Sequence, residues 1–183
     1  MANRADAADD APIPVGDAEL VLVPEPLLRA LARGEIDLDW GGLLAPSPET
    51  LADLPAKRRV AQIDADPAVR PWLIRLLVQD GRVAGHLGGH DRPDERGMVE
   101  IGYALDPAYR GRGLATDAAR AWFAWAHRRG ARVARLSFDP TNEASIAVGR
   151  RLGLRHVDDV WDVDDEVWEQ VWEAPLPLTP PSA

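Results

Sequence analysis

Two glycines and two arginines share one short stretch of the chain, Leu105–Ala118, where the residue types point most clearly to chemistry. Gly111 and Gly113 come directly before an expected helix, where the absence of side chains lets a ligand approach the backbone. The first N–H groups of a helix have no partners within it and lie at its positive end, so they favour an anion. Arg110 and Arg112 add positive charge to an otherwise acidic chain. The stretch therefore predicts a site for a phosphate-containing ligand such as a pyrophosphate.

Three kinds of phosphate-binding site contain glycines before a helix. A Walker loop requires Lys-Ser or Lys-Thr after its last glycine, and neither dipeptide occurs in the chain. A Rossmann fingerprint requires a third glycine where the chain has Thr116. It also belongs to a parallel βαβ unit, whereas this stretch follows expected antiparallel strands. A coenzyme A site is the third interpretation. A nucleotide-binding protein of another fold stays as an alternative if the loop prefers NAD or ATP.

The same stretch resembles the coenzyme A loop of the GNAT superfamily of N-acetyltransferases. Arg110, Gly113 and Ala115 match its (Gln/Arg)-x-x-Gly-x-(Gly/Ala) signature. The resemblance runs in order from about Trp72 to Val157, whereas the N-terminal part fits only as a strand followed by two helices. It is most similar to the RimJ/RimL-type branch, in which Asn-x-x-Ser opens the last helix. The flanking segments that carry the resemblance are Val99–Tyr103, Asn142-x-x-Ser145 and Leu152–Leu154.

This resemblance implies an acetyl-CoA-dependent N-acetyltransferase that acts on a primary amine by direct attack on the thioester, without a metal. In the family, the pantetheine arm lies between two strands that splay apart and pairs with the backbone of one of them. Backbone N–H groups of the loop cradle the pyrophosphate, and the asparagine amide binds the pantetheine or acetyl end. The residues thereby implied to bind the cofactor are Tyr103, Ala104, Leu105, Arg110, Gly111, Arg112, Gly113, Leu114, Ala115, Thr116 and Asn142.

The resemblance also implies the candidate catalytic residues, Glu100 and Ser145. Some family members have a glutamate base on this strand, and a mid-strand carboxylate must face a cleft, water or a partner. The alternative is that Glu100 faces solvent or pairs with Arg75. Many members carry a tyrosine acid where this chain has Gly149, so Ser145, Tyr103 or water is expected to protonate the thiolate, or it leaves unassisted. This departure keeps a second hypothesis open: an acyl-CoA-binding or sensing module with little or no turnover.

Trp40 and His86 are the candidate residues for a substrate pocket. Trp40 lies in the loop after the first expected helix, and His86 lies on an expected strand, four residues before His90. The two histidines lack the HExxH context of a zinc site, so no metal pair is expected. Either histidine could act as a base in a substrate pocket.

Composition narrows the class of protein. The 183 residues have a formal net charge of −9, which disfavours a general nucleic-acid partner and mildly suits a cationic acceptor, either a small amine or a protein N-terminus. The chain has no cysteine, which excludes disulfides and thiol nucleophiles. It shows no signal peptide and no apolar stretch long enough to span a bilayer, so we expect a cytoplasmic protein without a membrane partner.

The pattern of elements predicts an α/β fold of the GNAT type, with a mixed, mostly antiparallel sheet and helices on both faces. Residues 17–174 are expected to form one domain between two flexible tails, residues 1–16 and the Pro-rich 175–183. The apolar hairpin at the end of the domain suggests a homodimer. The ranges expected for individual elements are Glu19–Pro24, Trp72–Gln79, Arg82–Gly89, Met98–Leu105, Arg132–Phe138, Leu154–Val163 and Glu166–Glu173 for strands, and Glu25–Gly34, Pro48–Lys57, Gly113–Arg129 and Thr141–Leu152 for helices.

Overall fold

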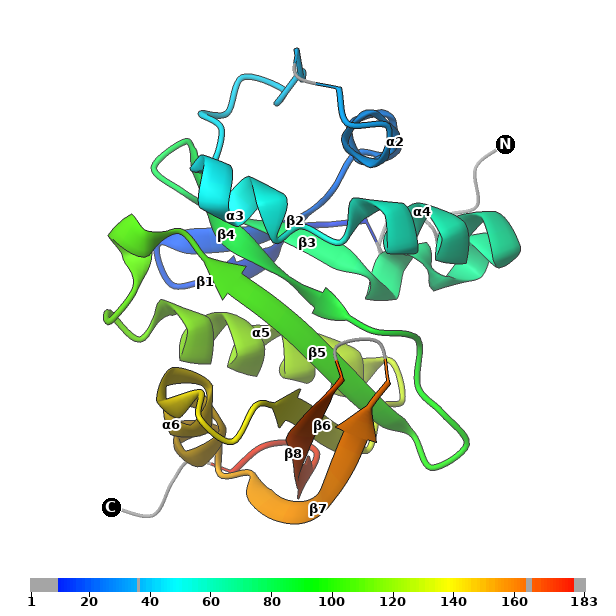
Figure 1. The fold of residues 1–183 in the computed structure, drawn as a ribbon, viewed down its shortest axis with the longest axis vertical. Helices are drawn as coiled ribbons and strands as arrows, with labels where there is room; N and C mark the ends of the chain where they lie inside the picture. Colours follow the sequence, from blue (N-terminus) through cyan, green and yellow to red (C-terminus); the bar gives the residue numbers. More distant parts are fainter. Residues whose placement is uncertain (1–9, 36, 164–165, 180–183) are drawn as a thin grey trace.

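One eight-stranded sheet organises the molecule, with the strand order β1-β2-β3-β4-β5-β6-β8-β7 (Figure 1). The computed structural model describes residues 10–35, 37–163 and 166–179. Neighbouring strands are antiparallel except for β5 and β6, which are parallel. This confirms the mixed, mostly antiparallel sheet. The strands are β1 (Ile13–Val15), β2 (Ala18–Leu22), β3 (Ile74–Gln79), β4 (Arg82–Gly89), β5 (Met98–Leu105), β6 (Val133–Phe138), β7 (Arg155–Asp162) and β8 (Val167–Pro175).

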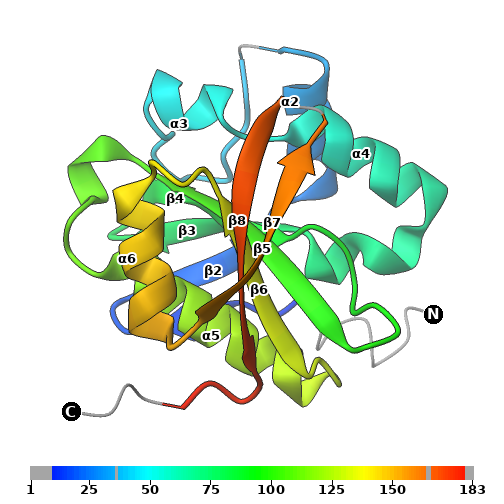
Figure 2. The same cartoon turned by 60° about the horizontal axis from the view of Figure 1, so that its bottom comes forward.

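Helices cover both faces of the sheet (Figures 1 and 2). Three helices lie on one face: α2 (Glu25–Ala32), α3 (Pro48–Ala52) and α4 (Ala56–Ala65). Two lie on the other: α5 (Leu114–Arg128) and α6 (Glu143–Leu152). Two short 3-10 helices, η1 (Pro67–Trp72) and η2 (Pro107–Tyr109), precede β3 and follow β5.

The sheet separates two apolar clusters because successive strand residues point to opposite faces. On β3, Leu76 packs into the cluster under α2 and α4, whereas its neighbour Leu77 packs into the cluster under α5. Trp122 and Phe123 of α5 are fully buried in the second cluster. The sheet therefore buries side chains on both faces. Residues of β5 and α5 pack in the same cluster, which fixes the position of α5 relative to β5.

The parallel strands β5 and β6 pair only along the first part of β5. The register runs from Met98 opposite Val133 to Glu100 opposite Arg135, yet β5 continues to Leu105. Beyond Glu100 the two strands therefore diverge, and this side of the β5 backbone has no paired strand. The connection between the two strands passes through α5, whose N-terminus lies after the far end of β5.

The ends of the domain differ from the sequence prediction. Ile13–Val15 forms β1 and pairs with β2, although residues 1–16 were expected to form a tail. A three-residue strand with a central proline gives little periodic signal, but Ile13 and Val15 are buried against the α5 side of the sheet. At the other end, Leu176 and Leu178 pack against the same cluster. Residues 1–9 and 180–183 of the expected tails lie outside the described residues.

Two further sequence predictions need correction. The single helix expected over Pro48–Lys57 is two helices, α3 and α4, separated around Pro55, and α4 continues to Ala65. The strand expected from Trp72 starts at Ile74, because η1 occupies Pro67–Trp72. The hairpin around Asp80-Gly81 is confirmed, with both residues at positive φ. The β7–β8 pair is also confirmed, but its expected turn at Asp164–Asp165 lies outside the described residues.

Candidate active site

A groove of about 540 Å³ opens where β5 and β6 diverge. It is lined by the end of β5, the loop and first turn of α5, and one face of α6. The structure thus brings together segments that are about forty residues apart in the chain. The lining residues are Tyr103, Ala104, Leu105, Arg110, Gly111, Gly113, Leu114, Ala115, Thr116, Asn142, Ala144, Ser145, Ala147, Val148 and Arg151.

The glycine loop at the start of α5 has the geometry of an anion cradle. Gly111 and Gly113 adopt φ values of +75° and +83°, which side-chain-bearing residues rarely adopt. Gly113 is the N-cap of α5, and no side chain caps the helix. A Cβ at either glycine would meet no protein atom within 4 Å, so the space beside the backbone is open. The first N–H groups of α5 can therefore bind a diphosphate, and the loop fits the group that the sequence implied.

The two arginines of the loop have different surroundings. Arg110 lines the groove, donates from Nε to the carbonyl oxygen of Leu105 at 2.9 Å, and pairs with Glu49 at 2.6 Å. Arg112 does not line the groove, and its guanidinium lies 6.0 Å from the ring centre of Tyr109. Of the two arginines, only Arg110 is thus placed to add charge to the groove.

Arg151 is a groove residue that the sequence analysis missed. It is on α6 with Ala144, Ala147 and Val148, and all four line the groove. Their spacing of three and four residues puts them on one face of the helix. That spacing was the available signal, but the sequence alone did not show that this face looks toward the loop before α5.

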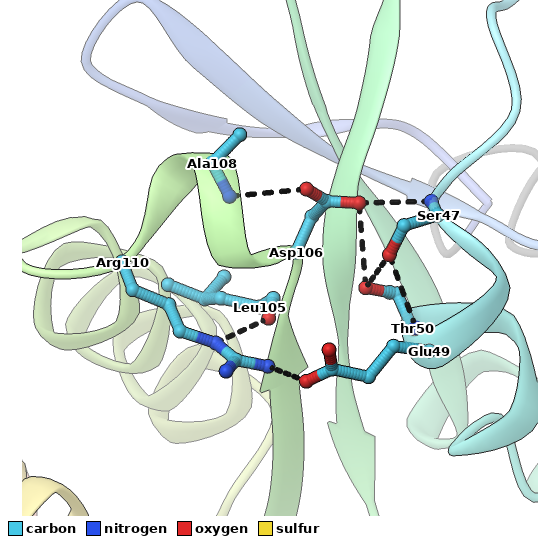
Figure 3. A network of polar contacts seen from close by, with 7 residues as sticks. All are labelled: Ser47, Glu49, Thr50, Leu105, Asp106, Ala108 and Arg110. Atoms are coloured by element: carbon cyan, nitrogen blue, oxygen red, sulfur yellow. Dashed lines mark hydrogen bonds and ion pairs between the residues drawn. The ribbon is translucent and has the colours of Figure 1, made fainter.

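A buried carboxylate ties this loop to α3 (Figure 3). Asp106 accepts a hydrogen bond from the backbone N–H of Ser47 at 2.8 Å and another from that of Ala108 at 3.1 Å. It also accepts from the Thr50 hydroxyl at 3.5 Å, while Ser47 caps α3 through the N–H of Thr50. These bonds lower the pKa of Asp106, with the Ser47 N–H as the largest cause. Asp106 stays ionised and anchors the turn that carries the glycine loop.

Two hydroxyl groups meet inside the groove. The Tyr103 hydroxyl donates to the Ser145 oxygen at 3.1 Å. Burial raises the pKa of Tyr103, although the bond to Ser145 lowers it, so the phenol keeps its proton at neutral pH. Asn142 is the N-cap of α6, and its side-chain oxygen accepts from the Ser145 N–H at 3.0 Å. Its amide nitrogen is therefore the part of the side chain that can donate to a ligand.

Comparison with known proteins identifies the family. The model of the acetyltransferase (GNAT) domain matches residues 26–155, which is more than half of the chain. The chain belongs to the GNAT acetyltransferase family. The groove between the diverging strands is accordingly the candidate active site of a GNAT acetyltransferase. No curated protein sequence matches the chain.

Solved structures show the same fold as this GNAT chain at low sequence identity. RimL, a ribosomal L7/L12 alpha-N-protein acetyltransferase in complex with coenzyme A, is 19% identical with a TM-score of 0.65, covering 90% of this chain and 98% of that one. An acetyltransferase from Salmonella typhimurium is 18% identical with a TM-score of 0.64, covering 91% and 99%. The microcin C7 self-immunity acetyltransferase MccE, bound to acetyl-CoA and AMP, is 14% identical with a TM-score of 0.60, covering 88% and 93%.

The remaining candidate residues of this GNAT domain lie outside the groove. The Glu100 side chain is 19% exposed, and its carboxylate lies 3.8 Å from Nδ1 of His90. Arg75, its alternative partner, is buried on the other face of the sheet and lies over the ring of Trp125 on α5. The ion pair with Arg75 is therefore not the arrangement found, and Glu100 faces His90.

His86 and Trp40 lie on the face covered by α2, α3 and α4. His86 is 6% exposed, and its Nε2 has no hydrogen-bond partner among the described residues. Burial lowers the pKa of His86 to about 4, so the ring is neutral at neutral pH. Trp40 packs at the border of the apolar cluster under α2 and α4. Neither side chain lines the groove.

Gly149 is part of the core of the GNAT domain. A Cβ at this position would lie 3.4 Å from Trp172 and 3.5 Å from Phe138. A tyrosine in place of Gly149 would therefore have to displace these rings. Among the described residues, no three His, Asp or Glu side chains cluster as metal ligands. No helix in the same part of the chain has the length and apolar character needed to cross a bilayer.

Proposed function

We propose that this GNAT protein is an acetyl-CoA-dependent N-acetyltransferase that acts on a primary amine. The observation that carries the proposal is the groove between the diverging strands, which ends at the glycine loop of α5. A groove with one unpaired backbone edge and one anion cradle suits a ligand with an amide-bearing arm and a diphosphate. Coenzyme A has both parts.

The chain's own groups provide the contacts for this cosubstrate. The N–H groups of Gly111–Thr116 hold the diphosphate, with Arg110 and Arg151 adding positive charge. The backbone of Tyr103–Leu105 offers the strand edge for the pantetheine arm, and the Asn142 amide donates nearby. Acetyl-CoA supplies an activated acetyl thioester when bound. The sequence has no cysteine and no Ser/His/Asp arrangement with the local context of an activated nucleophile, which favours direct attack of the amine on that thioester.

Ser145 and Tyr103 are the candidate groups for the departing sulfur. Both line the groove, and their hydroxyl groups are joined by a hydrogen bond of 3.1 Å. Tyr103 is protonated at neutral pH, so Ser145 can donate to the thiolate while it accepts from Tyr103. The pair thus offers a proton donor that does not depend on a side chain at position 149.

Charge and the related structures support two classes of acceptor. The Salmonella typhimurium acetyltransferase modifies the N-terminal serine of a ribosomal protein, which makes a protein N-terminal amine one candidate here. The net charge of −9 also favours small cationic amines. The alternative, an acyl-CoA-binding module without turnover, predicts cosubstrate binding but no thiol release with any amine.

Calorimetric titration with acetyl-CoA tests the cradle. The variant Gly113→Ala is expected to weaken binding at least tenfold, about 1.4 kcal/mol, because a Cβ at positive φ shifts the N–H groups and occupies the open space. Gly130→Ala is the matched control, since Gly130 has a φ of +97° at the far end of α5 with equally open surroundings.

Two results would contradict this proposal. One is a wild-type protein that binds NAD or ATP but not acetyl-CoA, and the other is equal affinity in the two glycine variants. Thiol release is then measured with an N-terminal-serine peptide, spermidine and kanamycin. Binding without release on all three amines would favour the non-catalytic module.

A further inference from the structure

His90, directly after β4, has a backbone that is fixed from two sides. Its N–H donates to the carbonyl oxygen of Glu100 on β5 at 2.8 Å. Its carbonyl oxygen accepts from Gln62 at 2.7 Å and from Arg59 at 3.2 Å, both on α4. Three hydrogen bonds thus hold one residue between the sheet and the covering helix, which restricts where its side chain can lie.

The imidazole of His90 lies over the point where the strands diverge. A Cβ at Gly102 would be only 3.0 Å from Nε2 of His90, so this ring occupies the space that a side chain at Gly102 would need. Glu100 is the last residue of β5 that pairs with β6, and Tyr103 is the first that lines the groove. Nε2 therefore lies beside Gly102, one residue before the groove begins at Tyr103, and faces the part of β5 next to the thioester if the pantetheine arm pairs with Tyr103–Leu105.

The other ring nitrogen of His90 faces a carboxylate. Nδ1 is 3.8 Å from the Glu100 carboxylate, and the His90 side chain is 41% exposed, so the ring is half-buried. The charged groups around the ring are Glu100 on β5, Asp162 on β7, and Arg58 and Arg59 on α4. The hairpin ends of β7 and β8 lie toward α2 and α4 in Figure 2.

These charges act on His90 in opposite directions. Burial is the largest effect and lowers the pKa of His90, and the two arginines lower it further, whereas Glu100 and Asp162 raise it. The ring is thus neutral at neutral pH and can accept a proton, and the two carboxylates stabilise the imidazolium that results. Neither His86, which is buried, nor Glu100 alone combines this exposure with this position.

We propose that His90 is the catalytic base, taking the proton of the acceptor ammonium on Nε2 with Glu100 as its positioning carboxylate. This rests on the proposed N-acetyltransferase function. The ammonium gives one proton to His90, the neutral nitrogen then forms the bond to the acetyl carbon, and the carbon–sulfur bond breaks. The nitrogen loses a second proton when the amide forms, and this proton converts the departing thiolate into a thiol. His90 then releases its own proton to water.

The test compares His90→Gln with His156→Gln on the intact protein. His156 is a matched control because it pairs with Asp159 at 2.9 Å on the exposed strand β7. With whichever panel amine the wild type turns over fastest, His90→Gln is expected to lower kcat/KM about 100-fold at neutral pH. Its acetyl-CoA affinity by calorimetry is expected to match that of the wild type, since His90 does not line the groove.

A second acceptor amine distinguishes a role of His90 as a base from a purely structural role. Aniline is unprotonated at neutral pH and needs no base to become a nucleophile, so the defect of His90→Gln is expected to shrink to a few-fold. The defect with the ammonium-type amine should also shrink as the pH rises. An equal loss on both amines, or no loss on either, would overturn the proposal.

The proton affinity of His90 provides a readout that does not depend on turnover. An NMR titration of the His90 ring is expected to show a midpoint below the ordinary histidine value, and Glu100→Gln should lower it further by removing a carboxylate. A midpoint that is the same in the wild type and in Glu100→Gln would overturn the pairing of His90 with Glu100. Failure of the wild type to bind acetyl-CoA would instead overturn the proposed function itself, so the two failures are distinguishable.

Discussion

At the scale of single residues, His86 links the fold to pH. Its pKa is lowered from 6.5 to about 4 by burial, so protonation favours the unfolded chain. The stability that comes from its neutral ring is complete above about pH 6.5 and is lost as the pH falls toward 4. We expect this one group to account for about 2 kcal/mol of lost unfolding free energy near pH 4.5.

The variant His86→Leu isolates this contribution. Urea unfolding at about pH 7 and about pH 4.5 should show a smaller loss of unfolding free energy in His86→Leu than in the wild type. His90 also has a lowered pKa and is present in both proteins, so the difference between them reports on His86. His156→Gln, which removes an exposed histidine, should behave like the wild type. Parallel pH dependences for all three proteins would contradict the assignment.

Sequence reasoning at this scale worked where the chemistry is local. The positive-φ glycines and the Asn142 cap lie within a few residues of the elements they control, so their types and spacing predict the loop and the helix start. The contact of His90 with Glu100 and Gly102 depends on how β4 registers against β5. That register is a long-range property, which a single sequence does not show.

At the scale of elements, the short helix α3 is held to the loop before α5 by Asp106. We expect Asp106→Ala to lower the unfolding free energy by about 1–3 kcal/mol, because it leaves the partly buried N–H of Ser47 without its acceptor. The same change should weaken acetyl-CoA binding, since the turn that positions Gly111 and Gly113 loses its anchor.

Asp106→Asn is the matched control for this prediction. It removes the charge but keeps an acceptor oxygen, so its effects on thermal unfolding and on calorimetric affinity should be smaller than those of Asp106→Ala. If Asp106→Ala unfolds and binds like the wild type, the network in Figure 3 does not support the loop.

The elements that the sequence missed share a physical cause. β1 pairs with β2 and buries Ile13 and Val15 in the cluster that includes α5, which lies about a hundred residues later in the chain. α4 has few apolar residues, and only Ala56, Arg59 and Ile63 are buried in it. Its weak periodicity gave no helix signal, whereas β3, β4 and β5 were predicted because their strand patterns and the Asp80-Gly81 turn are local.

At the scale of the whole molecule, net charge and the β7–β8 hairpin have opposite effects on the association of two copies of the chain. The chain carries a charge of −9, so two copies repel. Yet the hairpin exposes a group of apolar side chains. The rings of Trp161 and Trp168 pack edge to face, with 5.7 Å between their centres. The exposed group consists of Val157, Val160, Trp161, Val163 and Trp168. Such a group favours association with an apolar surface, which another copy of the same hairpin provides.

A homodimer formed through this hairpin should therefore become more stable as the salt concentration rises, whereas a dimer held by ion pairs becomes less stable. Raising the salt from about 0.01 M to about 1 M shortens the screening length from about 30 Å to about 3 Å, which weakens the repulsion but not apolar contact. Sedimentation should show a larger dimer fraction at high salt, and the double variant Trp161→Ser/Trp168→Ser should stay monomeric. Leu44→Ser removes an equally exposed apolar side chain away from the hairpin and should leave the dimer intact. A dimer that dissociates as salt rises, or that survives the double tryptophan variant, would mean that another surface joins the copies.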